Sequence, residues 1–203
     1  WGAFPINYPN AWDRMQGRTG FGIWLHGVPA DTYARAPRAS DGCIALANPD
    51  LEGLSRSVQV GVTPVIISDA IQWVGASELA VERDAFRKQL ETWRADWESR
   101  DAERYLAHYA PQFRSDAMDL AAWREHKRRV NSGKRWIKIG LANLSIFRSP
   151  GGQDLMVVTF MQDYRSSNLA QQTRKRQYWL REAGNWKIAY EGPVRGTPVV
   201  LPE

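Results

Sequence analysis

Cysteine and histidine are scarce in this chain, and long apolar runs are missing. One cysteine and three histidines occur among 203 residues. A single cysteine cannot form a disulfide within the chain, so cysteine usage does not indicate a redox compartment. No apolar run approaches the roughly 18 to 20 residues of a membrane-spanning helix, and we expect no membrane span. A signal peptide is also missing. Because the chain begins at Trp1, we interpret it as a processed or truncated product.

The composition is that of a globular protein with more basic than acidic residues. It is 43% hydrophobic and 24% charged, with a net charge of +5, which favours anionic partners such as nucleic acid or bacterial envelope polymers. The densest basic run, over 126–135, is typical of a solvated helix face and has no nucleic-acid motif beside it, so we expect no nucleic-acid partner. His108 and His126 lack metal-ligand spacing and are expected at the surface. We predict no metal and no cofactor.

The first of two predicted domains covers residues 1–74. It contains a short buried strand over 21–25, a helix over 51–58 with Asn48 as N-cap and Pro49 at its first position, and a strand over 60–68. Two or three strands are too few to close a sheet with two covered faces. We therefore expect the C-terminal part of a mainly β domain whose earlier strands lie outside this sequence, ending at a boundary near 71–77.

The second predicted domain, residues 75–203, changes from helical to strand periodicity. Apolar residues, from Leu79 and Phe86 to Leu90, Trp93 and Trp97, recur at three- and four-residue steps in the first segment. The fold class is α+β, a cone in which three helices precede a curved antiparallel sheet. The expected helices are 77–99, 101–109 and 119–131, and the expected strands are 136–147, 155–165, 173–182 and 186–190.

The candidate site lies between Gly22 and Leu46. His26 ends an apolar run, and Cys43, the one thiol of the chain, follows 17 positions later. A thiol attacks as its thiolate and needs a nearby base, which an imidazole on an adjacent strand end would supply. The competing interpretations are a buried cysteine that acts as a small hydrophobe and a histidine satisfied in the core.

Two families resemble this sequence. His26-Gly27, followed by Ser40-x-Gly42-Cys43, resembles the signature of the L,D-transpeptidase (YkuD-type) catalytic domain, and the run from Tyr8 to Arg18 resembles the segment before its histidine. The resemblance covers residues 2 to 70, the C-terminal half of such a domain. Residues 78 to 192 resemble the nuclear-transport-factor-2-like (SnoaL-like) cone through three short patterns: Gln162-Asp163-Tyr164, Lys175-Arg176-x-x-Trp179 and Gly184-x-Trp186-x-Ile188. The second resemblance implies fold far more than function.

The first resemblance implies a thioester mechanism on peptidoglycan stem peptides. Cys43 would be the nucleophile, His26 its base and later its acid, and the Gly27 carbonyl region would orient the ring. Ser40, Gly42 and Cys43 would form a turn whose N–H groups face the oxyanion, with Gly42 leaving room for substrate. The enzyme would release D-alanine from a tetrapeptide stem and pass the acyl group to an amine or to water.

Departures from the family pattern concern substrate binding. Asp41 stands where many relatives have His or Arg, and Ala45 stands where many have Arg. Arg35 or Arg38 in the loop would compensate as carboxylate-binding residues. The resemblance also places the protein in the periplasm or cell envelope, and it leaves L,D-transpeptidase and L,D-carboxypeptidase activity as open alternatives.

Two further alternatives concern the cone. It would serve as a non-catalytic module for wall binding or homodimerisation, or it would hold an acid/base site. For the latter, four residues are candidates, although salt bridging is the simpler interpretation: Asp163, Arg165, Arg176 and Glu191. Six tryptophans at helical and strand spacing are interpreted as mostly core rather than a sugar-stacking surface: Trp93, Trp97, Trp123, Trp136, Trp179 and Trp186.

Overall fold

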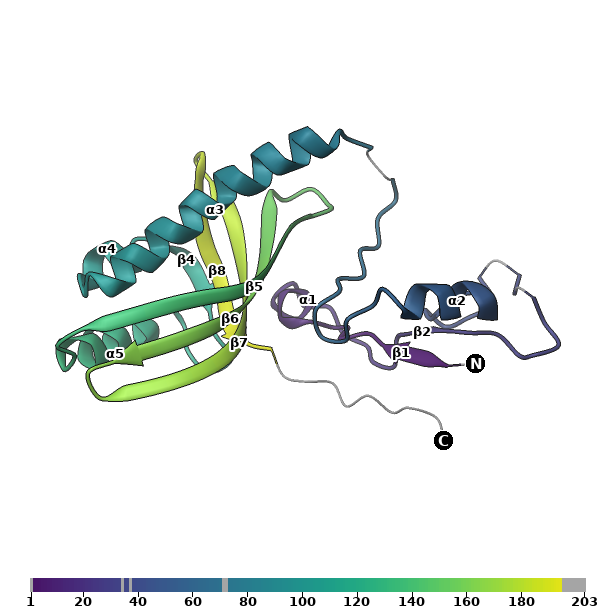
Figure 1. The fold of residues 1–203 in the computed structure, drawn as a ribbon, viewed down its shortest axis with the longest axis horizontal. Coiled ribbons are helices and arrows are strands. Elements are labelled where there is room, and N and C mark those ends of the chain that lie inside the picture. Colours follow the sequence, from purple (N-terminus) through teal and green to yellow (C-terminus); the bar gives the residue numbers. More distant parts are fainter. Residues whose placement is uncertain (1, 34, 37, 71–72, 195–203) are drawn as a thin grey trace. The chain divides into compact units, whose positions relative to one another are not determined.

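The computed structural model describes residues 2–33, 35–36, 38–70 and 73–194 (Figure 1). The chain divides into two compact units, one ending at Val65 and one from Ile66 to Val194, which we call the cone. Two residues of the predicted boundary segment, Ile71 and Gln72, lie outside the described residues.

The first unit holds a small mixed sheet and two short helices. Strand β2 (Trp24–His26) is central, with β1 (Ala3–Pro5) antiparallel on one side and β3 (Ile44–Ala45) parallel on the other. The helices are α1 (Ala11–Met15) and α2 (Asn48–Ser55). The predicted strand at 60–68 is wrong, because that segment contains no strand and its apolar side chains at 60 and 65–67 are exposed.

The two helices of this unit begin in different ways. The Asn10 side chain accepts hydrogen bonds from the Trp12 and Asp13 N–H groups, while the Asp13 carboxylate accepts from the Asn10 N–H, a reciprocal capping box. The predicted cap of α2 is wrong. Its N-cap is Ala47 without a side-chain bond, and Asn48 is the first helical residue, because its amide is engaged elsewhere.

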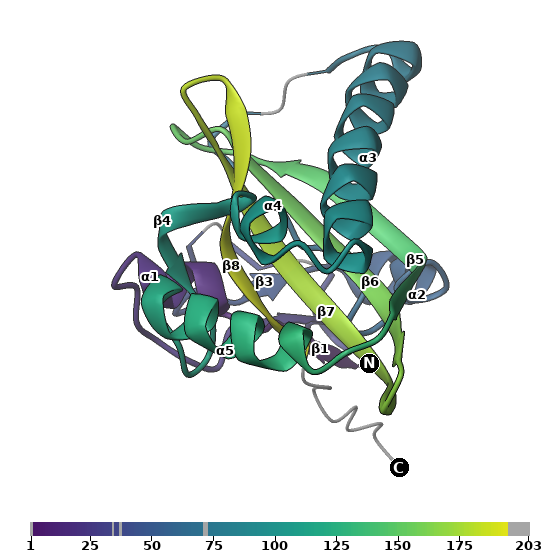
Figure 2. The same cartoon turned by 90° about the vertical axis from the view of Figure 1, so that its left-hand side faces the viewer.

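In the cone, helices α3 (Ala76–Glu98), α4 (Ala102–Leu106) and α5 (Leu120–Ser132) pack against one five-stranded sheet (Figures 1 and 2). Its order is β4-β8-β7-β6-β5. The predicted α+β cone is confirmed. The strands are β4 (Tyr109–Arg114), β5 (Ile137–Ser149), β6 (Leu155–Ser166), β7 (Leu169–Glu182) and β8 (Asn185–Pro193).

One strand of the cone was not predicted. The segment expected to continue a helix to Tyr109 leaves the helix at Leu106 and forms β4, which pairs parallel with β8. Pro111 lies within β4, and a proline is tolerated there because β4 is the edge strand of the sheet.

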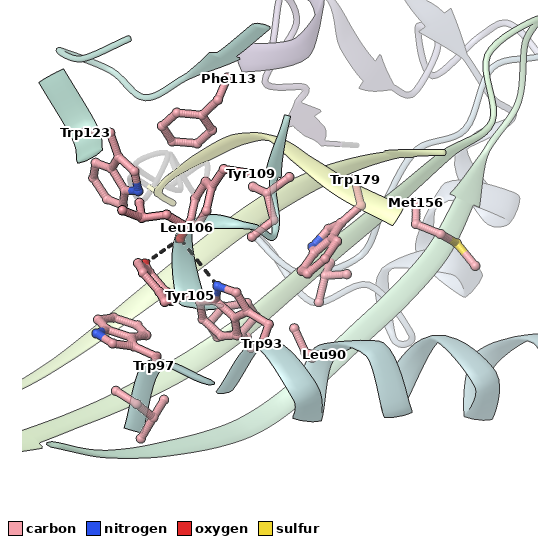
Figure 3. Packing of buried hydrophobic residues seen from close by; sticks show 14 of the residues in the cluster. Leu90, Trp93, Trp97, Tyr105, Leu106, Tyr109, Phe113, Trp123, Met156 and Trp179 are labelled. Atoms are coloured by element: carbon pink, nitrogen blue, oxygen red, sulfur yellow. Dashed lines mark hydrogen bonds between the residues drawn. The ribbon is translucent and has the colours of Figure 1, made fainter. Parts of the chain in front are cut away.

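The core of the cone is an aromatic cluster enclosed by the curved strands (Figure 3). Trp93 and Trp179 are fully buried, and Phe86 meets the Trp179 ring edge to face at 5.5 Å. Burial of large aromatic side chains supplies much of the hydrophobic stabilisation of such a domain. Leu79 and Trp136 depart from the prediction, since they are 44% and 46% exposed.

The opposite edge strand, β5, pairs only with β6 among the described residues. A bulge between Ala142 and Ser145 interrupts its register, and Asn143 within it has a left-handed φ of 52°. Near the start of β5, the Ile139 N–H donates to the Glu98 carboxylate of α3 at 2.7 Å. The row of free backbone groups along the outer edge of β5 is therefore interrupted at the bulge, and one N–H group near its start is already bonded to Glu98.

Three predicted surface residues of the cone are buried. Lys134 of the basic run is 8% exposed. His108 is also 8% exposed, and its imidazole hydrogen bonds to the Asp96 carboxylate at 2.8 Å. Lys127, from the basic run expected to be solvated, is 7% exposed among aromatic rings. None of the helices in the described ranges is long and apolar enough to cross a membrane.

Candidate functional site

His26 and Cys43 lie on neighbouring strands of the small sheet. His26 ends β2 and is in register with Ala45 of β3, and Cys43 directly precedes β3. Because side chains alternate along an extended chain, residues 43 and 45 share a face, so Cys43 lies on the face of His26. In the described part of the chain, the Cys43 thiol hydrogen bonds to the Gly22 carbonyl at 3.5 Å rather than to the imidazole.

The geometry at His26 selects one tautomer of its ring. Its Nδ1 lies 2.6 Å from the Gly27 carbonyl oxygen. A carbonyl only accepts, so Nδ1 carries the proton, and the lone pair of the neutral ring is on Nε2. This arrangement leaves Nε2 as the basic nitrogen.

The turn before Cys43 is tied by a side chain and depends on a glycine. The Ser40 hydroxyl donates to the Cys43 carbonyl at 2.7 Å. Gly42 has φ 109°, and an added Cβ would lie 2.9 Å from Ile23 Cδ1. The backbone conformation therefore requires glycine at this position, and an added methyl group would also displace the end of the Ile23 side chain.

The three loop residues expected to bind substrate are all exposed. Arg35 and Asp41 lie on the loop between β2 and β3, and Arg38 on the same loop has a left-handed φ of 61°. The structure brings none of them into an ion pair within the described residues. The carboxylate-binding role of Arg35 and Arg38 and the substrate-binding role of Asp41 stay predictions.

A second cluster of functional groups lies inside the cone, around Lys127. Its ammonium nitrogen is 4.3 Å from the centroid of the Trp123 ring and 4.4 Å from that of Trp97, which are cation–π distances. Burial, reinforced by the charge of Lys175, lowers the pKa of Lys127 to about 7. No described carboxylate forms an ion pair with Lys127, and the indole N–H groups of Trp97 and Trp123 have no described hydrogen-bond partner.

Beside this lysine lies a fully bonded carboxylate. Glu191 accepts hydrogen bonds from Lys175 at 2.7 Å, from the Tyr109 hydroxyl at 2.9 Å and from the Gln177 amide at 3.0 Å. Since Tyr109 gives its proton to Glu191, the Tyr105 hydroxyl, 2.5 Å away, donates to Tyr109 (Figure 3). Burial opposes ionisation of Glu191, but both lysines and these bonds outweigh it and hold its pKa below the usual value.

The four residues considered as an acid/base site in the cone do not converge. Asp163 pairs with Arg165 at 3.1 Å and Arg176 donates to Thr159, while Glu191 is bonded to Lys175. The described residues also contain no group of three His, Cys, Asp or Glu side chains that would hold a metal ion.

A shallow cavity of about 290 Å³ lies where α3 and α4 approach β8. His108 and Asp96 form its floor, and burial lowers the pKa of His108 against the opposing effect of Asp96. Gln89 contacts the other ring nitrogen of His108 at 3.3 Å, and Arg104 lies 2.7 Å from Asp96. His108 is therefore hydrogen bonded at both ring nitrogens, whereas Asp96 Oδ1 has an ion-pair contact with Arg104 and no hydrogen bond among the described residues.

The curved sheet and its helices define the class of the larger unit, a nuclear-transport-factor-2-like cone. Residues 85–192 match the Cds6 C-terminal NTF2-like domain, and the chain belongs to this family. Residues 1–67 match the L,D-transpeptidase catalytic domain. Both predicted resemblances are thereby confirmed.

Two solved structures are similar over nearly the whole chain. Bd1075 of Bdellovibrio bacteriovorus is 30% identical with a TM-score of 0.82, over 96% of this chain and 69% of that protein. The helical cell shape determining protein Pgp2 of Campylobacter jejuni is 30% identical with a TM-score of 0.67, over 93% of this chain and 67% of that protein. Among curated proteins no match is found. At family level these findings indicate a peptidoglycan-related function in the cell envelope.

Sequence reasoning missed two residues of these sites. The burial of Lys127 was signalled by its spacing, because Trp123, Lys127 and Asn131 recur every four residues and so lie on one face of α5. All three are buried in the structure. The sequence contains no signal that identifies the hydrogen-bond partner of Asn48. Its amide contacts the backbone of Val28, 20 residues earlier in the chain.

Proposed function

We propose that the protein is a peptidoglycan-modifying cysteine enzyme that acts on tetrapeptide stems. The observation that carries the proposal is the pairing of β2 with β3. With this register Cys43 and His26 share a face of the small sheet, and Nδ1 of His26 is bonded to the Gly27 carbonyl. The match to the L,D-transpeptidase domain and the likeness to a cell shape protein support it.

In the proposed reaction, Nε2 of His26 takes the proton of the Cys43 thiol. The sulfur adds to the carbonyl carbon of the third stem residue, and the N–H groups of the 40–43 turn stabilise the oxyanion. Such donors are each worth roughly 10²- to 10³-fold in rate. The bond to D-alanine then breaks, and the imidazolium returns the proton to the departing amine. Water or an amine resolves the thioester and regenerates the thiol.

The test is release of D-alanine from purified tetrapeptide muropeptides by the intact protein. Cys43→Ala is expected to abolish release, because the chain has no other thiol on which the thioester could form. A tripeptide product identifies a carboxypeptidase and a cross-linked dimer identifies a transpeptidase. Release by Cys43→Ala at the wild-type rate would refute the proposal.

A second candidate function concerns the cone and rests on buried hydrogen-bond donors that have no acceptor among the described residues. Lys127 and the indole N–H groups of Trp97 and Trp123 present three donor groups without an acceptor among the described residues. A buried cation surrounded by aromatic rings favours an anionic group that would neutralise it. On this basis we propose that the cone binds a carboxylate of a peptidoglycan fragment, as a module separate from Cys43.

Tryptophan fluorescence is the assay for this second function, because two indoles contact Lys127. Titration with tripeptide muropeptides is expected to give a saturable change that Lys127→Met removes and Cys43→Ala keeps. Lys138→Met, at an exposed lysine of β5, is the matched control. Equal binding by Lys127→Met and the wild type would exclude the site.

A further inference from the structure

We infer that Asn48 is a positioning residue for the proposed catalytic histidine, and that it acts on His26 through the Gly27–Val28 peptide. The inference rests on the proposed function. The Asn48 amide bonds both backbone groups of Val28: its Oδ1 accepts from the N–H at 3.0 Å, and its Nδ2 donates to the C=O at 2.9 Å. Neither bond belongs to the cap of α2.

The two ends of one peptide group connect Asn48 to the imidazole. The Val28 N–H and the Gly27 C=O belong to the same planar unit, so holding the N–H fixes the direction of the carbonyl. That carbonyl is the group 2.6 Å from His26 Nδ1. Hydrogen bonds at opposite ends of a peptide also polarise each other, which strengthens both.

The glycine at position 27 follows from the same contact. A Cβ on Gly27 would lie 2.1 Å from Asn48 Oδ1 and 3.6 Å from Leu51 Cδ2. Leu51 is fully buried and anchors α2 in this place. Glycine therefore lets the amide of α2 approach the backbone beside the histidine.

The neighbouring backbone groups are held differently. The His26 carbonyl accepts from the Leu46 N–H at 2.9 Å, and the Gly27 N–H donates to the Gly2 carbonyl at 3.1 Å. These bonds fix the preceding peptide without a side chain. The Gly27–Val28 peptide is the one whose N–H is bonded to Asn48, so loss of this amide frees the carbonyl that selects the tautomer of His26.

Two variants separate positioning from general stability. Asn48→Leu keeps the size of the side chain and removes both bonds, whereas Asn48→Asp keeps an acceptor for the Val28 N–H. Asn10→Leu is the matched control, because it also removes two hydrogen bonds between an asparagine side chain and the backbone of this unit, here those from two N–H groups at the start of α1. Thermal unfolding of all variants verifies that each is folded at the assay temperature.

The first readout is the tautomer of His26, measured by ¹⁵N NMR of the imidazole. Assignment is simple because the chain has three histidines and His26→Gln removes one signal. The wild type, Asn48→Asp and Asn10→Leu are expected to show the Nδ1–H form, and Asn48→Leu a mixture with the Nε2–H form. An unchanged Nδ1–H form in Asn48→Leu, or the same mixture in Asn10→Leu, would overturn the inference.

The second readout is kinetic. Asn48→Leu is expected to lower kcat for D-alanine release by roughly 10- to 100-fold, the effect typical of groups that orient a functional histidine, with KM little changed. If the wild type releases no D-alanine while the tautomer still responds to Asn48, the proposed function fails and the positioning role stands.

Discussion

Lys127→Met provides a quantitative test of the cone interior. Lys127 is 7% exposed, and burial followed by the repulsion of Lys175 lowers its pKa from 10.5 to about 7 against the opposing attraction of Glu191. Between these two pKa values the unfolded chain holds a proton that the folded chain lacks. The stability contributed by this group therefore rises with pH from about 7 to 10.5, and below pH 7 it stays at its lowest level.

The magnitude follows from the two pKa values. Each pH unit inside the window is worth at most about 1.4 kcal/mol, and the group is half-titrated at its lower limit. From pH 7 to pH 9 the wild type should therefore gain roughly 2 kcal/mol that Lys127→Met does not gain. Methionine is the chosen replacement because its unbranched side chain fills the same irregular space between the rings without a charge.

Urea unfolding followed by tryptophan fluorescence at pH 6, 7, 8 and 9 measures this difference. The stability of Lys127→Met relative to the wild type should fall by roughly 2 kcal/mol between pH 7 and pH 9. Lys138→Met, at an exposed lysine, should show a difference independent of pH. A constant difference for Lys127→Met across this range would refute the reasoning, because it would mean that Lys127 keeps its charge inside the fold.

Three further predictions use the packing and caps described above. Gly42→Ala should abolish D-alanine release while the cone still unfolds at its wild-type urea midpoint. The reason is that φ 109° and the Ile23 contact concern only the turn before the thiol, and release at the wild-type rate would contradict this. Trp179→Ala should cost about 3 to 5 kcal/mol of cone stability by urea unfolding, since the ring is fully buried, and a loss below 1 kcal/mol would count against the core assignment. Asp119→Ala should lower the stability of the cone by about 1 kcal/mol, because Asp119 caps α5 through the Ala122 N–H. Circular dichroism melting measures this loss, and an unchanged melting curve would show that the cap is dispensable.

The sequence was most informative where local pattern and packing agree. Helical spacing located α3, because its buried residues Phe86, Leu90 and Trp93 lie on one face. Alternation located the start of β5, where Ile137 and Ile139 are buried between exposed residues, whereas β6 is a mostly apolar run buried on both faces over Leu155–Phe160. Pattern failed at the strand predicted over 60–68, where β-branched residues have no partner strand in the described chain. It failed again at β4, because Pro111 is a stop signal for a helix and is also acceptable in an edge strand.

The sequence predicted which residue types form the candidate site, but not the hydrogen bonds that hold them in position. The spacing of His26 and Cys43 and the glycine beside each are visible in the sequence, whereas the bond between Asn48 and Val28 depends on how α2 packs. Lys127 was misjudged for a similar reason. A charge in a basic run is ordinarily solvated, and only the rings of Trp97 and Trp123 around it make its burial tolerable.

The interrupted edge of β5 restricts how two copies of the cone can associate. Joining two sheets edge to edge needs a continuous row of free backbone groups, and this row is broken at the bulge by Asn143 and blocked near its start by the Glu98 carboxylate on the Ile139 N–H. A continuous sheet joined through the β5 edges of two molecules is thus disfavoured. If the protein forms a dimer, its interface should be built from side chains, so replacing surface residues will disrupt it more readily than changing the backbone of β5.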